Sequence, residues 1–152
     1  TMNNLTIGGP GFTYYETIGG GQGASMDGDG PSAVHVAMSN TRNTPVEVCE
    51  VAYPLRVERY AIRRGSGGAG RHRGGDGVAR RIRLLGPATV SVIAERRARG
   101  PAGVRGGDDG LPGTTRINGR PMPAKWRGDL SPGDVIEIET PGGGGWGAAP
   151  VE

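Results

Sequence analysis

The sequence has a single cysteine, Cys49, which excludes an internal disulfide and a zinc site built from several cysteines. Aromatic residues make only 5% of the chain, with one phenylalanine among them. So few aromatic side chains among 18 basic residues argue against a nucleic-acid-binding protein. No apolar run approaches the roughly 18 residues that a membrane span needs, and no signal peptide precedes the first predicted strand. We therefore expect a cytoplasmic protein without nucleic-acid or membrane partners.

Large apolar residues are also scarce. Leucine, isoleucine, valine and phenylalanine supply about 18% of the chain, below the roughly 20% associated with disorder, while 31 residues are glycine and 12 are proline. Disorder also requires a high net charge, and the net charge here is only +3. The apolar residues gather in short strand-like runs. We expect one folded domain over residues 1–152 that completes its core against another chain or domain.

The chain opens with Thr1-Met2 rather than with methionine, which favours a segment of a longer or processed polypeptide. A terminal threonine can also act as a nucleophile whose own amine is the base. A hydrolase of that kind is an alternative that the sequence leaves open.

Period-2 alternation of apolar residues predicts a mainly β fold, sandwich-like or barrel-like, with glycine-rich loops. The Asn118-Gly119 pair predicts a tight hairpin within 115–122. The other predicted strands are residues 1–7, 12–18, 34–38, 54–63, 78–85, 89–95 and 135–140. In the strand at 54–63, a phase slip at Arg59 predicts a bulge, with Tyr60 and Ile62 facing inward beyond it.

One short helix is predicted near 45–52. Thr44 would be its N-cap, Pro45 its first helical residue, and Glu47 the partner of Thr44 in a capping box. The helix must end before Pro54. Cys49 lies in an apolar run here, which favours packing over reactivity.

The densest group of polar and glycine residues lies between Phe12 and Pro54. Five glycines fall between Gly19 and Gly28, and glycine lets a backbone pass close to a ligand. Asp27, Asp29 and His35 are the catalytic candidates, because a histidine beside two carboxylates can serve as an acid or base. Asn40 and Asn43 are candidate substrate-binding residues. The alternative is a connector whose Asp and Asn side chains bond only their own backbone.

A second glycine loop covers residues 65–77. Gly65, Gly67 and Gly70 match the G-x-G-x-x-G spacing, but a dinucleotide site also needs a helix to open there, and Arg-His-Arg-Gly-Gly predicts none. Arg71 and Arg73 remain candidate anion or substrate donors. The alternative is a long hairpin connection.

The chain closes with four consecutive glycines, Gly142 to Gly145, followed by Trp146. This segment carries no catalytic side chain, so a structural role is favoured over a strand end held close to a ligand.

Five segments together resemble the hydantoinase B/5-oxoprolinase family, and their order and approximate spacing agree with that family's C-terminal region. They lie at residues 16–24, 38–47, 53–54, 66–75 and 140–147. The resemblance covers essentially the whole chain but only the C-terminal part of a much longer family member. It therefore marks the chain as the C-terminal portion of a B-type subunit.

The resemblance implies an ATP-dependent hydrolase of cyclic amides such as hydantoin, 5-oxoproline and related lactams. An A-type partner binds ATP and phosphorylates the substrate or an intermediate, and the B-type polypeptide carries a metal-dependent site. The family's metal motif, Asn-Asp-Pro followed by Gly-Gly-Thr-His, does not occur in this sequence. We therefore expect no cofactor on this chain, a divalent metal on the absent N-terminal part, and no activity of the chain alone.

Related family members carboxylate ketones. A second hypothesis is therefore a structural or subunit-docking module of an ATP-dependent ketone carboxylase complex, with no active-site residues of its own.

Overall fold

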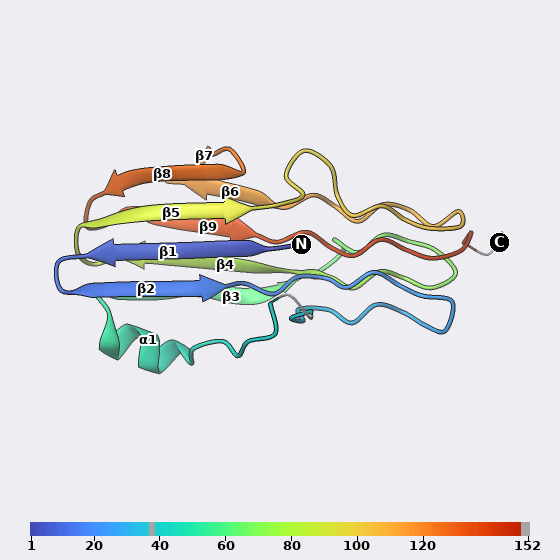
Figure 1. Ribbon diagram of the computed structural model, residues 1–152, viewed down its shortest axis with the longest axis horizontal. Helices are drawn as coiled ribbons and strands as arrows, with labels where there is room; N and C mark the ends of the chain where they lie inside the picture. The colour runs from blue at the N-terminus through green and yellow to red at the C-terminus, as the bar shows by residue number, and fades with distance from the viewer. Residues whose placement is uncertain (37–38, 150–152) are drawn as a thin grey trace.

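The computed structural model describes residues 1–36 and 39–149 and forms a β-sandwich of two antiparallel sheets, drawn in Figure 1. The four-stranded sheet has the order β2-β1-β5-β8 and consists of β1 (Asn3–Gly9), β2 (Phe12–Thr17), β5 (Ala88–Ala94) and β8 (Lys125–Leu130). The five-stranded sheet has the order β3-β4-β9-β6-β7 and consists of β3 (Leu55–Arg63), β4 (Gly77–Leu84), β6 (Thr114–Ile117), β7 (Arg120–Pro121) and β9 (Val135–Glu139). The helix α1 (Val46–Ala52) precedes β3. The sandwich prediction is confirmed.

The core lies between the sheets because alternate residues of each strand point inward. The four-stranded sheet contributes Leu5, Ile7 and Val90, and the five-stranded sheet contributes Ile82 and Ile136. All five side chains have 1% or less of their surface exposed. The scarce apolar residues are thus concentrated in one continuous layer.

Several local predictions are confirmed. Asn118 and Gly119 both have positive φ, 50° and 78°, as the tight turn between β6 and β7 requires. The register of β3 against β4 shifts between Val57 and Arg59, so the predicted bulge is present. Cys49 is fully buried on α1.

Tyr60 and Ile62 face inward as predicted, but their side chains are not fully covered. They pair with Arg80 and Val78 on β4, whose side chains are buried, yet they remain 37% and 43% exposed. The reason is that β3 is the edge strand of its sheet, where little covers the inner face.

Two further predictions need correction, and one strand was not predicted. The N-cap of α1 is Pro45 rather than Thr44, with no side-chain capping bond, so the predicted capping box is absent. The strand expected at 34–38 reduces to an isolated bridge between Val34 and Gly20, and residues 37 and 38 lie outside the described part. β8 was not predicted, because Lys125–Leu130 alternates charged residues with Trp126 and Gly128 rather than with aliphatic ones.

Among the described residues, no helix is both long and apolar enough to cross a membrane.

Candidate functional site

Four glycine-rich segments leave the same end of the sandwich and run side by side, as Figure 1 shows. We call residues 19–34, 65–76, 100–113 and 140–147 the glycine bundle. The last of these segments is its centre. Gly145 donates to Asp108 and Gly143 donates to Gly75, while Ala24 donates to the carbonyl of Gly144. One extended segment thus bonds to three neighbours, which a strand in a flat sheet cannot do. The four glycines have the structural role that the sequence favoured.

The absence of side chains makes this packing possible. A Cβ on Gly143 would lie 1.9 Å from the carbonyl oxygen of Gln22, and one on Gly74 would lie 2.0 Å from that of Gly143. Real Cβ atoms essentially never come this close to a backbone oxygen. Glycine is therefore required here for close approach of chains.

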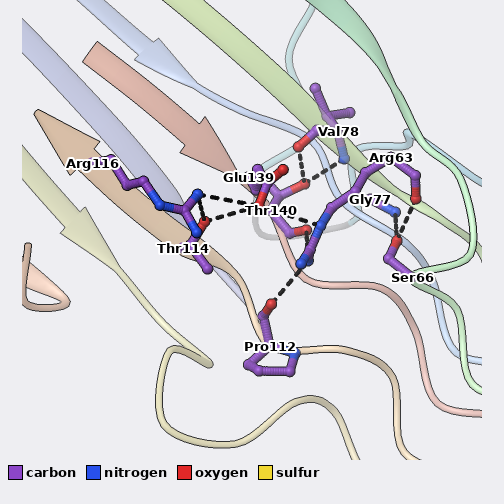
Figure 2. Close-up of polar contacts among 9 residues, drawn as sticks. All are labelled: Arg63, Ser66, Gly77, Val78, Pro112, Thr114, Arg116, Glu139 and Thr140. Atoms are coloured by element: carbon purple, nitrogen blue, oxygen red, sulfur yellow. Dashed lines mark hydrogen bonds and ion pairs between the residues drawn. The ribbon is translucent and has the colours of Figure 1, made fainter. Parts of the chain in front are cut away.

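Buried polar side chains fasten the bundle to the sandwich, as Figure 2 shows. Thr140, fully buried, accepts from the backbone N–H of Val78 at 2.7 Å, and Ser66 accepts from that of Gly77 at 2.8 Å. Arg63 at the end of β3 donates to the carbonyls of Pro112 and Thr140 at 2.8 and 3.3 Å. These bonds fix the direction in which the bundle leaves the sheets.

A cleft of about 170 Å³ opens where the first bundle segment meets the end of the sandwich. The residues that line it include 19–23, Asn3, Val34, Ser39 and Pro141. Asn3 is 2% exposed, and its Oδ1 receives no hydrogen bond from any described residue. The cleft lining therefore combines glycine and apolar residues with the polar residues Thr1, Asn3, Gln22 and Ser39.

His35 lies beside this cleft. Its Nε2 is 3.2 Å from Oδ1 of Asn43, and its Nδ1 is 3.3 Å from Oγ of Ser39. The ring sits next to Gly19, where a Cβ would be 3.6 Å from Nε2. Asn43 in turn donates from Nδ2 to the hydroxyl of Tyr60. The structure thus brings together two of the predicted site residues, His35 and Asn43.

A buried ion pair lies between the sheets near the same end. Nε of Arg80 on β4 is 2.8 Å from Oε2 of Glu16 on β2, and the guanidinium also lies over the ring of Tyr60 at 4.5 Å. Burial raises the pKa of Glu16 above its ordinary value, and the charge of Arg80 opposes this shift. Burial likewise raises the pKa of the Tyr60 hydroxyl, with the negative charge of Glu16 adding to the effect. The environment of His35 and Asn43 is therefore linked, through Tyr60, to a charged pair in the core.

The other predicted site residues lie elsewhere. Asp29 accepts from the backbone N–H of Arg73 at 2.7 Å, and its carboxylate is 3.7 Å from Nδ1 of His72. The guanidinium of Arg73 donates to Asp76 at 2.9 Å. Asp27 is exposed and its backbone N–H bonds to Ser25.

The side chains of Arg71 and Asn40 are both exposed, and each residue makes a hydrogen bond through its backbone N–H. Arg71 donates its N–H to Gly147 within the glycine bundle, and Asn40 donates its N–H to Val36. The predicted residues therefore form two groups, one at the cleft and one along the bundle, and their catalytic and substrate-binding roles stay predictions.

Sequence reasoning missed Asn3, Glu16 and Arg80 as functional candidates. The alternation of each strand does indicate that Asn3 and Arg80 occupy inward-facing positions. Asn3 is in phase with the inward-facing Leu5 and Ile7, and Arg80 lies between the inward-facing Val78 and Ile82. A polar residue in an inward phase marks a buried polar group that needs a partner.

The described residues contain no group of three or more His, Cys, Asp or Glu side chains placed to hold a metal ion. The donor set in residues 1–36 and 39–149 thus does not fit a divalent metal.

Comparison with known proteins finds relatives over nearly the whole chain. The profile of the hydantoinase B/oxoprolinase family matches residues 1–149. The chain is 43% identical over 152 residues to 5-oxoprolinase 1 of Arabidopsis thaliana, a match that covers 97% of this chain and 12% of the plant protein. It is 34% identical over 143 residues to a putative D-/L-hydantoinase subunit of the B type from a Pseudomonas species, covering 90% of this chain and 24% of that protein.

Among solved structures, the fold resembles the ATP-dependent caprolactamase from Pseudomonas jessenii. The TM-score is 0.79 at 25% sequence identity, and the match covers 95% of this chain and 28% of that chain. The chain therefore spans between 12% and 28% of the length of these three proteins.

Proposed function

The chain belongs to the hydantoinase B/oxoprolinase family, and from this premise we propose that it forms part of an ATP-dependent hydrolase that opens small cyclic amides. In this proposal it supplies one wall of the substrate cleft, and an ATP-binding A-type partner activates the substrate. The similarity to a caprolactamase described as ATP-dependent supports the reaction class. The Pseudomonas relative is named as one subunit of a hydantoinase, which supports a partner.

The single observation on this chain that carries the proposal is the cleft beside Gly19–Gly23. Its volume of about 170 Å³ lies below the roughly 300–1,000 Å³ of pockets for drug-sized ligands, so it suits a small molecule. Five consecutive residues line it, four of them glycines, which allows a ligand to approach the chain closely. Size and lining both agree with a small ring as substrate.

An ATP-binding partner is needed because an unstrained amide is a poor electrophile. Transfer of a phosphoryl group to the amide oxygen turns that oxygen into a good leaving group. The loop at Gly65, Gly67 and Gly70 offers no nucleotide site of its own, since residues 71–76 contain no helix whose N-terminus could hold phosphates. We therefore assign ATP to the partner and the metal to another part of the B-type polypeptide.

His35 is the residue of this chain best placed to hold or move a proton near the cleft. Oδ1 of Asn43 can only accept, so Nε2 of His35 carries the proton when that bond is made. Nδ1 is then free to accept from the hydroxyl of Ser39, which also lines the cleft. The tautomer of His35 is thus set by Asn43.

ATP turnover tests the proposal. The whole B-type polypeptide would be mixed with its ATP-binding partner and with hydantoin, 5-oxoproline, caprolactam, or a ketone plus bicarbonate. We expect one cyclic amide to stimulate ATP hydrolysis and to appear as the ring-opened product. Stimulation by the ketone, or by no substrate while the two proteins still co-purify, would overturn the proposal and favour a carboxylase or a docking role.

A further inference from the structure

Ser39 lies between the cleft and His35. It is half-buried, and it lines both the cleft of about 170 Å³ and a neighbouring cavity of about 200 Å³. Among the described residues that line these two spaces, Ser39 is the one whose side chain bonds to the His35 ring, with Oγ 3.3 Å from Nδ1. His35 itself lines neither space in the described part of the chain. The shortest protein path for a proton between the cleft and His35 therefore runs through the Ser39 hydroxyl.

The hydrogen bonds around His35 can accommodate one proton on the ring or two. Oδ1 of Asn43 accepts from Nε2 in both cases, and the amide is held at its other end by the bond from Nδ2 to the hydroxyl of Tyr60 on β3. When Nδ1 carries no proton, the Ser39 hydroxyl donates to it. When Nδ1 is protonated, Oγ of Ser39 accepts and its hydrogen turns to the carbonyl of Val36, 3.3 Å away. Rotation of one O–H bond thus connects the two states, as a proton relay requires.

We propose that Ser39 is a further catalytic residue, whose hydroxyl contacts the cyclic amide in the cleft and passes a proton from His35 to the ring nitrogen. The inference rests on the proposed function, since it assigns the cleft to the substrate. A proton is needed there because an amine anion is a very poor leaving group, and supply of such a proton is general acid catalysis.

The step balances as follows. Water adds its hydroxyl to the carbon and its hydrogen to the ring nitrogen of the amide that the partner has phosphorylated on oxygen. The bond from that carbon to the nitrogen then breaks, and its electron pair stays on nitrogen, which takes the proton of the Ser39 hydroxyl. Oγ takes the proton of Nδ1, and His35 is left neutral with its proton on Nε2. The added hydroxyl becomes the carbonyl and releases its proton to solvent, and a second water hydrolyses the acyl phosphate to carboxylate and phosphate.

The kinetic experiment uses the whole B-type polypeptide with its ATP-binding partner and caprolactam as substrate. The variants are Ser39→Ala, Ser39→Thr, which keeps a hydroxyl, His35→Ala, and the double variant of Ser39→Ala with His35→Ala. Ser25→Ala is the matched control, because Ser25 is exposed and its Oγ accepts only the backbone N–H of Asp27 among the described residues.

We expect Ser39→Ala to lower kcat for ring opening by about 100-fold or more with little change in KM, and Ser39→Thr to recover most of that loss. The double variant should be no slower than His35→Ala alone, because residues that act as one unit have non-additive effects on kcat. Ser25→Ala should behave as wild type. A kcat for Ser39→Ala equal to that of wild type, or losses that simply add in the double variant, would overturn the relay.

A second measurement needs no turnover. In the variant Ser39→Cys, the rate at which iodoacetamide alkylates the introduced thiol is followed by peptide mass mapping, with and without caprolactam and without ATP. The buried Cys49 serves as the internal reference. We expect caprolactam to slow alkylation of the introduced thiol. Equal rates would overturn the contact between Ser39 and the ligand.

The two measurements separate the inference from the proposed function. If caprolactam protects the introduced thiol but no cyclic amide stimulates ATP hydrolysis in wild type, the proposed function fails and the ligand contact of Ser39 stands. If wild type opens the ring but Ser39→Ala does so equally fast and caprolactam gives no protection, the proposed function stands and the inference fails.

Discussion

Glu16 and Arg80 face each other across the two sheets, with Nε of Arg80 2.8 Å from Oε2 of Glu16 and only 4% and 1% of their side chains exposed. The pair joins β2 to β4 at the end of the sandwich from which the glycine bundle leaves. Tyr14 adds a contact, since its hydroxyl accepts from the Arg80 guanidinium at 3.4 Å. Two charges are thus placed in a core that has few apolar residues.

Removing one partner of this pair should be costly. Arg80→Met leaves a carboxylate buried without its counter-ion, which typically costs about 3–5 kcal/mol of unfolding free energy. The double variant Glu16→Leu with Arg80→Met should recover much of that loss, because well-packed apolar residues often replace a buried pair without penalty. Urea unfolding of wild type, Arg80→Met, Glu16→Leu and the double variant measures both effects. Additive losses in the double variant would show that the two residues do not act as a pair.

The turn before β9 should make the free energy of unfolding depend on pH in the acidic range. The backbone N–H of Ser131 and the side-chain amide of Asn118 donate to Asp134 and lower its pKa below the ordinary value. A carboxyl group with a lowered folded pKa stabilises the fold above the unfolded pKa of about 3.9 and loses that contribution as pH falls through the folded pKa.

Asp134→Asn should therefore be less stable than wild type at pH 7, and the difference should shrink as pH falls below about 4. Urea midpoints of both proteins across this range give the comparison. A difference that is constant with pH would mean that the carboxylate charge has no part in the turn.

The glycine bundle should tolerate a methyl group only where space exists. Gly143→Ala puts a Cβ 1.9 Å from a backbone oxygen that cannot rotate away, so we expect a loss at or above the roughly 1–3 kcal/mol of an overpacked core. Gly28→Ala is the control, because a Cβ there meets nothing within 4 Å. It should be neutral, or slightly stabilising through the unfolded chain. Equal thermal midpoints for the two variants would contradict the packing described here.

The role of His35 is tested in the working complex. If it holds or moves a proton near the cleft, His35→Ala should lower kcat for lactam-stimulated ATP hydrolysis by about 10²–10⁴-fold, the usual range for a general acid or base. Asp27→Ala should have a smaller effect, because Asp27 is exposed and away from the Asn43 contact. Turnover equal to wild type in both variants, with the subunits still associated, would favour the docking hypothesis.

Local pattern predicted much of the fold. Alternation predicted most of the strands, and the Asn118-Gly119 pair predicted its hairpin because both residues adopt positive φ readily. Alternation did not predict β8, because its inward positions hold Trp126, Gly128 and Leu130 rather than a regular aliphatic series. The prediction of Thr44 as N-cap is wrong because the N-cap is set by the residue at which the chain enters the helix, and here Pro45 is that residue.

The site was harder to predict. Residue type alone indicates His35 and Asn43 as candidates, and the structure shows their side chains in contact although they lie eight residues apart in the sequence. Asp29 was expected beside His35, but it bonds to Arg73, 44 residues away. No local pattern encodes that contact, since it depends on how the bundle segments lie side by side.

The sequence by itself determined the class of fold and the need for glycine, because alternation and backbone freedom act between neighbouring residues. The tertiary structure alone decided that Gly142–Gly145 would form the buried centre of a bundle, and that Glu16 would meet Arg80. Each of these depends on contacts between segments more than 60 residues apart or on the shape that such contacts enclose. Local preferences do not encode such contacts, and the packing of the two sheets and the bundle supplies them.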